Sequence, residues 1–144
     1  MNIKVVLDDG AYMPEKAHEE DAGFDLRTPI DFYLCGSNNE LGEGRQVIDT
    51  GVHIEIPSGY VGMLKSKSGL NVKDNIISEG VIDCGYTGSI RVKLYNLGNT
   101  GKFFKKGDKI TQLVIMPIAK AKLTQVEYLS DTERGNNGFG SSGR

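Results

Sequence analysis

Short segments that alternate between apolar and polar residues recur along most of this chain, and they constrain its fold more than any other feature. β-branched residues are common in them, and turn sequences such as Pro57-Ser58-Gly59 separate one segment from the next. Helical spacing is not sustained anywhere, apart from one or two possible turns after Ser68. The pattern predicts an all-β domain built as a sandwich, a jelly roll or a barrel. The expected strands are residues 3–7, 47–49, 52–56, 60–65, 90–95, 110–118 and 123–128.

The length of 144 residues fits one domain with one core. Hydrophobic periodicity ends near Ser130, and glycine becomes frequent from Thr132 onward. Because glycine loses much backbone entropy when it is ordered, such a segment cannot fold alone. We therefore expect a β domain over residues 1–130 and a flexible C-terminal segment over residues 131–144.

The charge balance excludes one class of partner. Seventeen Lys and Arg residues nearly offset nineteen Asp and Glu residues, which leaves a formal net charge of −2. A protein that follows a polynucleotide needs an excess of positive charge, so we expect no polynucleotide partner. A small anionic ligand held by a few cations remains compatible with this composition.

The N-terminal residues turn acidic too early for a signal peptide, and no apolar run reaches the length of a membrane span. These features predict an intracellular, cytoplasmic protein without a membrane partner. Cys35 and Cys84 lie far apart without CxxC spacing, so neither a zinc site nor a disulfide framework is expected. His53 alternates with apolar neighbours, which indicates a solvated strand position rather than a metal ligand.

The segment from Gly80 to Gly88 places a carboxylate, Asp83, three residues before a phenol, Tyr86. In a hairpin with an irregular turn both side chains could face a pocket, and unpaired backbone around Ile82 could read the edge of a base. The alternative is that Asp83 and Gly85 only form the turn.

Three other segments carry weaker signals. Residues 65–70 combine lysines, serines and a possible helix start, which favours binding of an anion. Asp25 lies between apolar residues and would need partners if it were buried, and Gln112 is a polar residue within an apolar strand. In the C-terminal segment, Arg134 could bind phosphate and Phe139 could stack on a base. Each of these segments could also be an ordinary turn, strand or terminus.

Taken in order, five segments resemble the ordered motifs of the trimeric dUTPase family. They are Ala22-Gly-Phe-Asp25-Leu, Ser66-Lys-Ser68-Gly-Leu, Gly80-Val-Ile-Asp83-Cys-Gly-Tyr86, Gly107-Asp-Lys-Ile-Thr-Gln112-Leu and Arg134-Gly-Asn-Asn-Gly-Phe139-Gly-Ser-Ser-Gly. The resemblance implies a jelly-roll subunit and a homotrimer whose three active sites lie at subunit interfaces. It also implies Mg²⁺-dependent hydrolysis of dUTP to dUMP and pyrophosphate.

The resemblance assigns roles to individual residues. Asp83 is implied to contact the deoxyribose and to activate the attacking water, and Tyr86 to exclude a ribose 2′-OH. Ser68, Gln112 and Arg134 are implied to bind phosphate groups, Phe139 to cover the uracil, and Asp25 to support the water shell of the metal. The other implied substrate-binding positions are Lys67, Gly69, Gly80, Ile82, Arg91, Gly140, Ser141 and Ser142.

The sequence departs from the family pattern at a few positions. Lys67 stands where arginine is usual, so a bidentate contact becomes a point charge. Thr87 and Ser89 replace a frequent Arg and Glu pair, which should have little effect because exposed ion pairs contribute little. Ser142 replaces a common threonine and keeps the hydroxyl group.

Two alternatives to a dUTPase remain. A dCTP deaminase has the same fold, but its proton-carrying glutamate corresponds here to Lys93 and a second functional arginine corresponds to Val72. A nucleotide-binding or regulatory module without catalytic activity is the other alternative. It is disfavoured because every implied catalytic position is filled.

Overall fold

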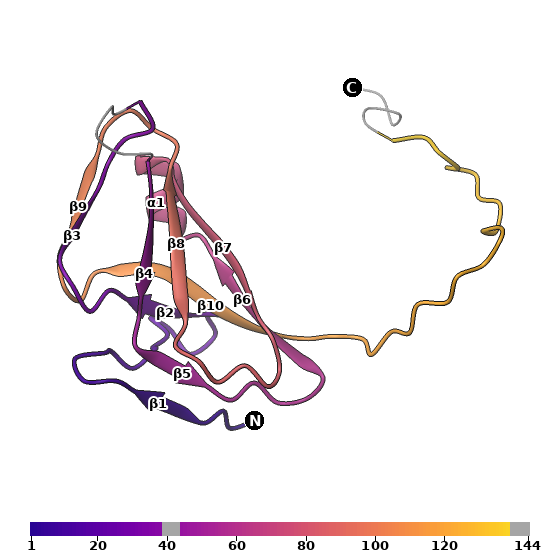
Figure 1. Cartoon of the computed structure of the whole chain (residues 1–144), viewed down its shortest axis with the longest axis horizontal. Coiled ribbons are helices and arrows are strands. Elements are labelled where there is room, and N and C mark those ends of the chain that lie inside the picture. The colour runs from indigo at the N-terminus through magenta and orange to yellow at the C-terminus, as the bar shows by residue number, and fades with distance from the viewer. Residues whose placement is uncertain (39–43, 139–144) are drawn as a thin grey trace.

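The computed structural model describes residues 1–38 and 44–138. Ten strands and one short helix make up this part of the chain (Figure 1). In chain order they are β1 Val5–Leu7, β2 Gly23–Arg27, β3 Phe32–Leu34, β4 Arg45–Asp49, β5 Val52–Ile54, β6 Tyr60–Lys65, α1 Ser68–Asp74, β7 Ile76–Ile82, β8 Arg91–Asn96, β9 Lys102–Phe104 and β10 Lys109–Pro117.

The strands form antiparallel sheets that curl around one core. Six strands lie in the order β2-β10-β6-β7-β8-β4, and two short sheets pair β1 with β5 and β3 with β9. β10 is paired on both sides, with β2 and with β6. This arrangement is the jelly roll that the sequence leads us to expect.

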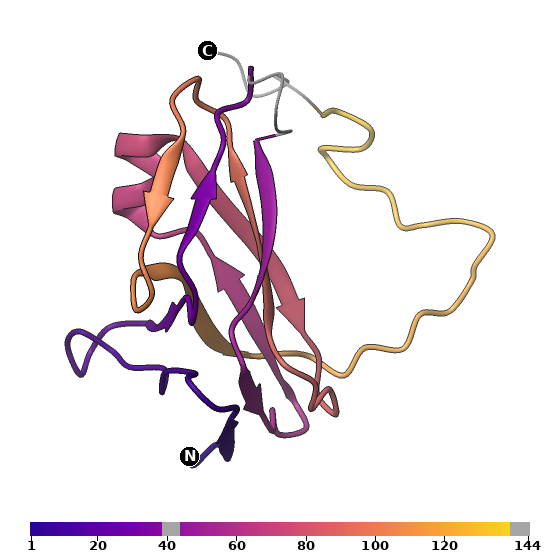
Figure 2. The ribbon, with the colours of Figure 1, turned by 60° about the vertical axis from the view of Figure 1, so that its left-hand side comes forward.

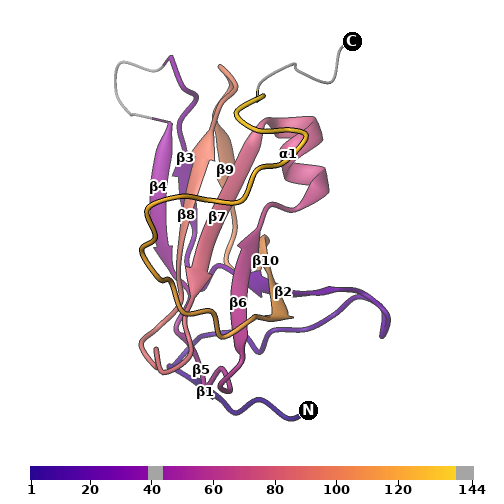
Figure 3. The same ribbon diagram turned by 90° about the vertical axis from the view of Figure 1, so that its right-hand side faces the viewer.

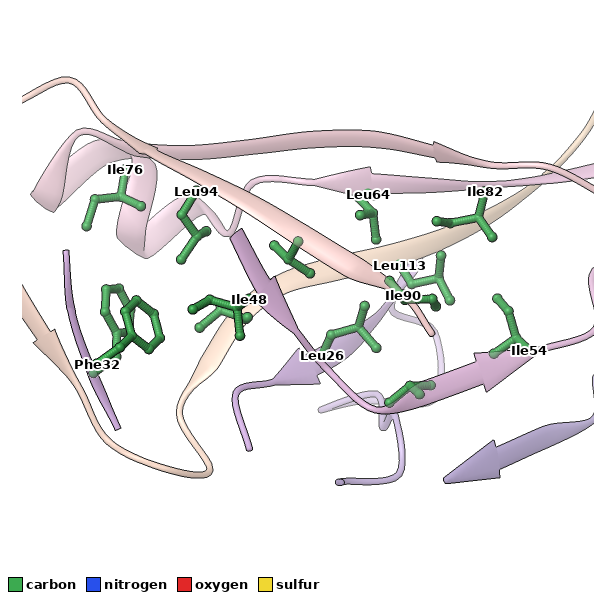
Figure 4. Packing of buried hydrophobic residues seen from close by; sticks show 14 of the residues in the cluster. Leu26, Phe32, Ile48, Ile54, Leu64, Ile76, Ile82, Ile90, Leu94 and Leu113 are labelled. Atoms are coloured by element: carbon green, nitrogen blue, oxygen red, sulfur yellow. The ribbon is translucent and has the colours of Figure 1, made fainter. Parts of the chain in front are cut away.

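Aliphatic side chains from both sides of the curl fill the interior (Figure 4). Leu26, Val92 and Leu94 are fully buried, and the Phe32 and Phe104 rings stack with their centroids 4.8 Å apart. Every second residue of β8 points inward, as expected for a strand with one buried face. The alternation of apolar and polar residues in the sequence therefore identifies which residues of β8 face the core.

Helix α1 connects β6 to β7 (Figure 3). It begins at Ser68, where the sequence predicted a helical turn, and it ends at Asn75, which has a left-handed conformation with a φ of 56°. None of its residues is buried. The helix therefore contributes little to the core, and its main structural effect is to place Lys67 and Ser68 at one end of β6.

The sequence prediction missed several strands. β2, β3, β7 and β9 were not predicted, because β3 and β9 have only three residues each and because glycine and polar residues interrupt the apolar pattern of β2 and β7. The expected strands that overlap β1, β4, β5, β6, β8 and β10 are confirmed, with ends that differ by a few residues.

The strand predicted at residues 123–128 is wrong. After Ile118, whose N–H donates to the Gly59 carbonyl oxygen over 2.9 Å, the described chain leaves the sheets and stays exposed to residue 138 (Figure 2). Leu123 is 95% exposed, and the hydrogen bonds of described residues 119–138 are all local. A strand needs a paired neighbour, and this segment, which we call the arm (residues 119–138), has none among the described residues of its own chain.

Within the described residues, no helix is long and apolar enough to span a membrane.

Candidate functional site

The hairpin loop between β7 and β8 presents Asp83 and Tyr86 to solvent. The Tyr86 N–H donates to the Asp83 carbonyl oxygen over 3.1 Å, and Gly85 supports the turn with a φ of 88°. The Tyr86 hydroxyl donates to the Ser89 carbonyl oxygen over 2.9 Å. The predicted turn is therefore present, and it leaves Asp83 and Tyr86 exposed; the expectation that both face a pocket stays a prediction.

Tyr86 folds back over its own loop. A Cβ atom on Gly88 would lie 2.6 Å from the Tyr86 hydroxyl oxygen, so only glycine leaves room for the ring there. Despite this close approach, Tyr86 remains 45% exposed. One face of its ring is thus available to a ligand.

The backbone before Asp83 is paired on one side only. Ile82 pairs with Gly62 of β6, so the expectation that this backbone is unpaired is wrong for that side. On the other side, the β7–β8 ladder covers only Ile76 to Ser78, although β7 continues to Ile82. The hairpin therefore opens between Gly80–Ile82 and the start of β8, and this opening has the strand edge that a base could pair with.

Residues at the corner between β4 and β5 contact the other side of the β7–β8 hairpin loop. Asp49 accepts hydrogen bonds from the Ser89 hydroxyl and, over 3.1 Å, from the Gly51 N–H, and its second oxygen lies 3.4 Å from Arg91 Nε. The Ser89 hydroxyl lowers the pKa of Asp49, and the Gly51 N–H and the Arg91 charge add to this against the effect of burial. Asp49 was not predicted as part of the site, because only the fold brings it to this loop.

His53 also contacts the loop. The predicted strand position is confirmed, since His53 is the middle residue of β5, but its ring is half-buried and both nitrogens have partners. Nδ1 lies 2.8 Å from the carbonyl oxygen of Thr87, and Nε2 lies 3.3 Å from Oδ2 of Asp8.

A second polar group lies at the far end of β6. The buried Asp25 on β2 forms ion pairs with Lys67, which precedes α1, and with Lys109 at the start of β10, the latter over 2.6 Å. Gln112 is the register partner of both Asp25 and Lys65, and its side-chain N–H donates to the Ser66 carbonyl oxygen over 3.1 Å. The sequence expectation that a buried Asp25 needs partners is met by these two lysines.

Opposing effects act on Asp25. Burial tends to raise the pKa of this carboxyl, but the hydrogen bonds and charges of Lys109 and Lys67 outweigh burial and hold the pKa below its usual value. Asp25 is therefore ionised at neutral pH, and it offsets part of the positive charge of the two lysines.

A hydroxyl network behind this group was missed by the sequence reasoning. Ser78 and Thr111 are buried and their hydroxyl oxygens lie 2.7 Å apart, and Thr111 also donates to the Lys65 carbonyl oxygen over 3.0 Å. The Ser66 hydroxyl donates to the Ser78 carbonyl oxygen over 3.1 Å. These bonds fix the peptide that precedes Lys67. They could not be predicted from the local sequence, because the partners come from three different strands.

The remaining predicted residues lie in different places. Ser68 and Gly69 are exposed in the first turn of α1, and Arg91 is exposed at the start of β8. Arg134 is exposed in the arm, where its Nε donates to the Asn137 carbonyl oxygen over 3.1 Å. Phe139, Gly140, Ser141 and Ser142 lie outside the described residues.

One chain does not bring all these groups together. Ile82 pairs with Gly62 and Gln112 pairs with Lys65, so the hairpin group and the Asp25 group are separated by three residues of β6, about 10 Å. Arg134 belongs to the arm, and the arm runs away from the sheets that carry both groups (Figure 1). The described residues therefore place these three groups at separate points of one chain.

Within the described residues, an apolar cavity lies apart from the predicted site. A cavity of about 600 Å³ lies between the N-terminal segment, β2 and β10, and none of the predicted site residues lines it. No group of three or more His, Cys, Asp or Glu side chains within the described residues could hold a metal ion. The candidate site is therefore an open surface whose chemistry depends on a few charged and hydroxyl side chains.

Known proteins resemble this chain over nearly its whole length. The family model described as dUTPase matches residues 9–143. A deoxyuridine 5′-triphosphate nucleotidohydrolase of Tropheryma whipplei is 42% identical, with 96% of this chain and 94% of the relative covered. A protein of the same description from Clostridium kluyveri is 41% identical, with 92% of this chain and 91% of the relative covered.

Solved structures of dUTPases share the fold. A variant of the Staphylococcus bacteriophage 80alpha dUTPase with dUpNHpp superposes with a TM-score of 0.85 at 34% identity, and 99% of each chain is covered. A variant of the dUTPase from phage phi11 of S. aureus, described with a structural Mg(II) ion, gives a TM-score of 0.79 at 30% identity, covering 89% of this chain and 98% of the phage protein. Together with the family match, these similarities show that the chain belongs to the dUTPase family.

Proposed function

We propose that this dUTPase hydrolyses dUTP to dUMP and pyrophosphate, with Asp83 positioning and deprotonating the water that attacks the α-phosphorus. Asp83 suits this role because it lies on the outside of a fixed turn and its side chain is exposed to solvent. A carboxylate held in this way can accept a proton from water in the transition state. The observation that carries the proposal is the open hairpin with Asp83 and Tyr86 on one turn.

The opening between β7 and β8 supports recognition of uracil. Backbone N–H and C=O groups at a strand edge can pair with the edge of a base, and the β7 edge beyond Ser78 is not covered by the β8 ladder. Because the β7 backbone is held on its other side by β6, it cannot easily move to admit a larger base. The rigid backbone would thus reject the methyl group of thymine.

Tyr86 is proposed to select for deoxyribose. The Tyr86 hydroxyl donates a hydrogen bond to Ser89, and the ring packs closely against the Gly88 backbone. These two contacts restrain the ring. A ring fixed against the sugar leaves no space for a 2′-OH, so selectivity comes from exclusion rather than from a hydrogen bond.

The triphosphate is proposed to bind the group at the other end of β6, contributed by a neighbouring copy. Lys67 and Lys109 supply positive charge, Ser68, Gly69 and Gln112 supply donors, and Arg134 reaches the terminal phosphate from the arm. We assign the same phosphate-binding function to Arg91, and we assign closure over the uracil and phosphates to residues 139–142.

Mg²⁺ is the proposed cofactor, carried by the triphosphate. When bound, it neutralises phosphate charge and polarises the P–O bonds. Asp25 fits a supporting role, because each carboxylate oxygen keeps a lone pair beyond its bond to lysine and could accept a hydrogen bond from metal-bound water. A fully protein-made cage is not required for a hydrated Mg²⁺.

A homotrimer is the proposed assembly, since it would bring the hairpin of one copy to the Asp25 group and the arm of others. The arm exposes Leu123, Val126 and Leu129, which a neighbouring copy could cover. We place the activity inside the cell, where the free thiols Cys35 and Cys84 stay reduced.

The decisive experiment measures pyrophosphate release from dUTP, dTTP, dCTP and UTP with Mg²⁺. Activity on dUTP alone is the expected result. Release of ammonia from dCTP would instead indicate a deaminase, but Lys93 points its ammonium group at the Tyr95 ring, 5.1 Å from the centroid, where that chemistry needs a proton-carrying carboxylate. Binding of dUTP without hydrolysis would indicate a regulatory module.

A further inference from the structure

His53 connects three segments that are far apart in the sequence. It lies between the buried residues Val52 and Ile54, and its ring points away from the core. Nδ1 lies 2.8 Å from the Thr87 carbonyl oxygen in the hairpin loop, and Nε2 lies 3.2 Å from Oδ1 and 3.3 Å from Oδ2 of Asp8 at the end of β1. One imidazole thus joins β5, the β1 end and the loop that carries Asp83 and Tyr86.

Both partners of the ring are hydrogen-bond acceptors. A carbonyl oxygen and a carboxylate can only accept, whereas a neutral imidazole has a single N–H. One of the two contacts would then place an acceptor nitrogen against an acceptor oxygen. Only the imidazolium form donates from both nitrogens, so the observed contacts require a protonated His53.

The charged groups around the ring favour the same form. The hydrogen bond to Thr87 raises the pKa of His53 most, the bond to Asp8 adds to it, and the charges of Asp8 and Asp49 act in the same direction against a small effect of burial. The Arg91 side chain is paired with Asp49, which limits its repulsion of the ring. Both contacts are therefore made together below the unfolded-state pKa of about 6.5, and one of them is lost as the pH rises through the higher folded-state pKa.

The Thr87 carbonyl belongs to the part of the loop that directly follows Tyr86. The later part is fixed independently, because the Ile90 N–H donates to the Val52 carbonyl oxygen over 2.9 Å and the Ser89 hydroxyl donates to Asp49. Residues 83–87 are exposed. The His53 contact thus extends the fixed part of the loop from Ser89 to the Thr87–Gly88 peptide, against which the Tyr86 ring packs.

We infer that His53 is a positioning residue for Tyr86, whose protonated ring fixes the Thr87–Gly88 peptide and so makes discrimination between dUTP and UTP depend on pH. This inference rests on the proposed role of Tyr86 in excluding a ribose. When His53 loses its proton, the remaining N–H stays on Nε2, because the charged Asp8 carboxylate is a stronger acceptor than the Thr87 carbonyl oxygen. The Thr87–Gly88 peptide is then released and the Tyr86 ring gives way to a 2′-OH. Hydrolysis of dUTP itself changes less, since deoxyribose does not press on the ring.

The test compares kcat/KM for dUTP with kcat/KM for UTP between pH 6 and pH 9. The uracil and triphosphate titrate equally in both substrates, so their effects cancel in the ratio. In the unaltered protein we expect the ratio of kcat/KM for dUTP to kcat/KM for UTP to fall by about 2- to 10-fold as the pH rises. This range corresponds to the free energy of one hydrogen bond. The midpoint should coincide with the titration of the His53 ring measured by NMR.

Three variants sharpen this comparison. His53→Gln can donate to Thr87 without titrating, so its ratio should stay flat. Asp8→Asn removes the carboxylate and should move the midpoint to lower pH. His18→Gln, in an exposed segment outside the site, is the matched control and should behave as the unaltered protein does. An identical pH profile in His53→Gln and the unaltered protein would overturn the inference.

Amide hydrogen exchange separates this inference from the proposed function. At each pH, the Thr87 and Gly88 amides of the unaltered protein are compared with those of His53→Ala, so that the intrinsic pH dependence of exchange cancels. Faster exchange in the variant at pH 6, with the difference lost at pH 9, supports the contact even if dUTP is not a substrate. Equal exchange at every pH refutes it even if dUTP is hydrolysed.

Discussion

Asp83 is the residue on which turnover should depend most strongly. Asp83→Asn keeps the size of the side chain and the backbone turn but removes the base. We expect kcat to fall by about 10²- to 10⁴-fold while dUTP still binds, because a positioned base acts mainly in the transition state. Steady-state kinetics and a direct dUTP binding measurement check this. The exposed Asp9→Asn serves as the control, and full turnover in Asp83→Asn would remove this residue from the mechanism.

Asp25 should matter for stability as well as for activity. Asp25→Asn leaves Lys67 and Lys109 facing each other without the intervening charge. We expect a loss of about 1–3 kcal/mol in the free energy of unfolding at pH 7, a range that allows for solvent screening because both lysines are partly exposed. Urea unfolding measures this loss.

The same carboxyl predicts a pH dependence. Since the pKa of Asp25 is lowered in the folded state, its stabilising effect is present above the unfolded-state pKa of about 3.9 and is lost as the pH falls through the lower folded-state pKa. Unfolding measured from pH 7 to pH 2 should therefore show a smaller acid-induced loss in Asp25→Asn than in the unaltered protein. Parallel curves would contradict this assignment.

At the scale of elements, the β7–β8 hairpin depends on the absence of a side chain at Gly88. In Gly88→Ala the new Cβ atom would approach the Tyr86 hydroxyl to 2.6 Å, so the ring must move. We expect weaker discrimination against UTP with little change in thermal stability, because the Tyr86 ring that must move belongs to the exposed residues 83–87. The ratio of kcat/KM for dUTP and UTP, read beside the melting temperature, checks this, and Ser58→Ala in the exposed β5–β6 turn is the control.

The elements also show how much of the fold and of the site can be predicted from the sequence alone. Alternation correctly predicted β6, β8 and β10, because each presents one face to the core, and the Ser-Gly signal correctly predicted the start of α1. The same alternation failed at residues 123–128, since pairing requires a partner strand that local pattern does not reveal. The turn at Asp83 was predictable from its own residues. The contact of His53 with Thr87 was not, because 34 residues separate them and only the fold brings them together.

At the scale of the whole molecule, the proposed use of the hairpin from one copy and the arm from another predicts that impaired chains can complement each other. Asp83→Asn lacks the base, and Arg134→Ala lacks a phosphate contact from the arm. If each site takes these residues from different copies, mixing the variants under conditions that exchange subunits should restore up to about a quarter of the sites. Pyrophosphate release before and after mixing measures this, and no recovery after proven exchange would show that both residues serve one site from one chain.

Removal of the C-terminal segment tests its proposed closing role. A chain truncated after Glu133 loses Arg134 and the residues that follow it. We expect kcat/KM for dUTP to fall by about 5- to 150-fold, which corresponds to about 1–3 kcal/mol for the loss of stacking on a base. The melting temperature should hardly change, because residues 134–138 are exposed and bond only locally. Full activity of the truncated chain would refute the closing role.

If a neighbouring copy completes the site, as proposed, the separation of the hairpin group from the Asp25 group along β6 has a consequence for control in the cell. A lone subunit would be folded but inert, so catalytic output would rise more steeply than protein concentration when the chain is scarce. Dilution would then lower the activity reversibly, without an inhibitor and without unfolding of the subunit. The amount of protein made, rather than any regulatory ligand, would set the threshold at which dUTP begins to be cleared.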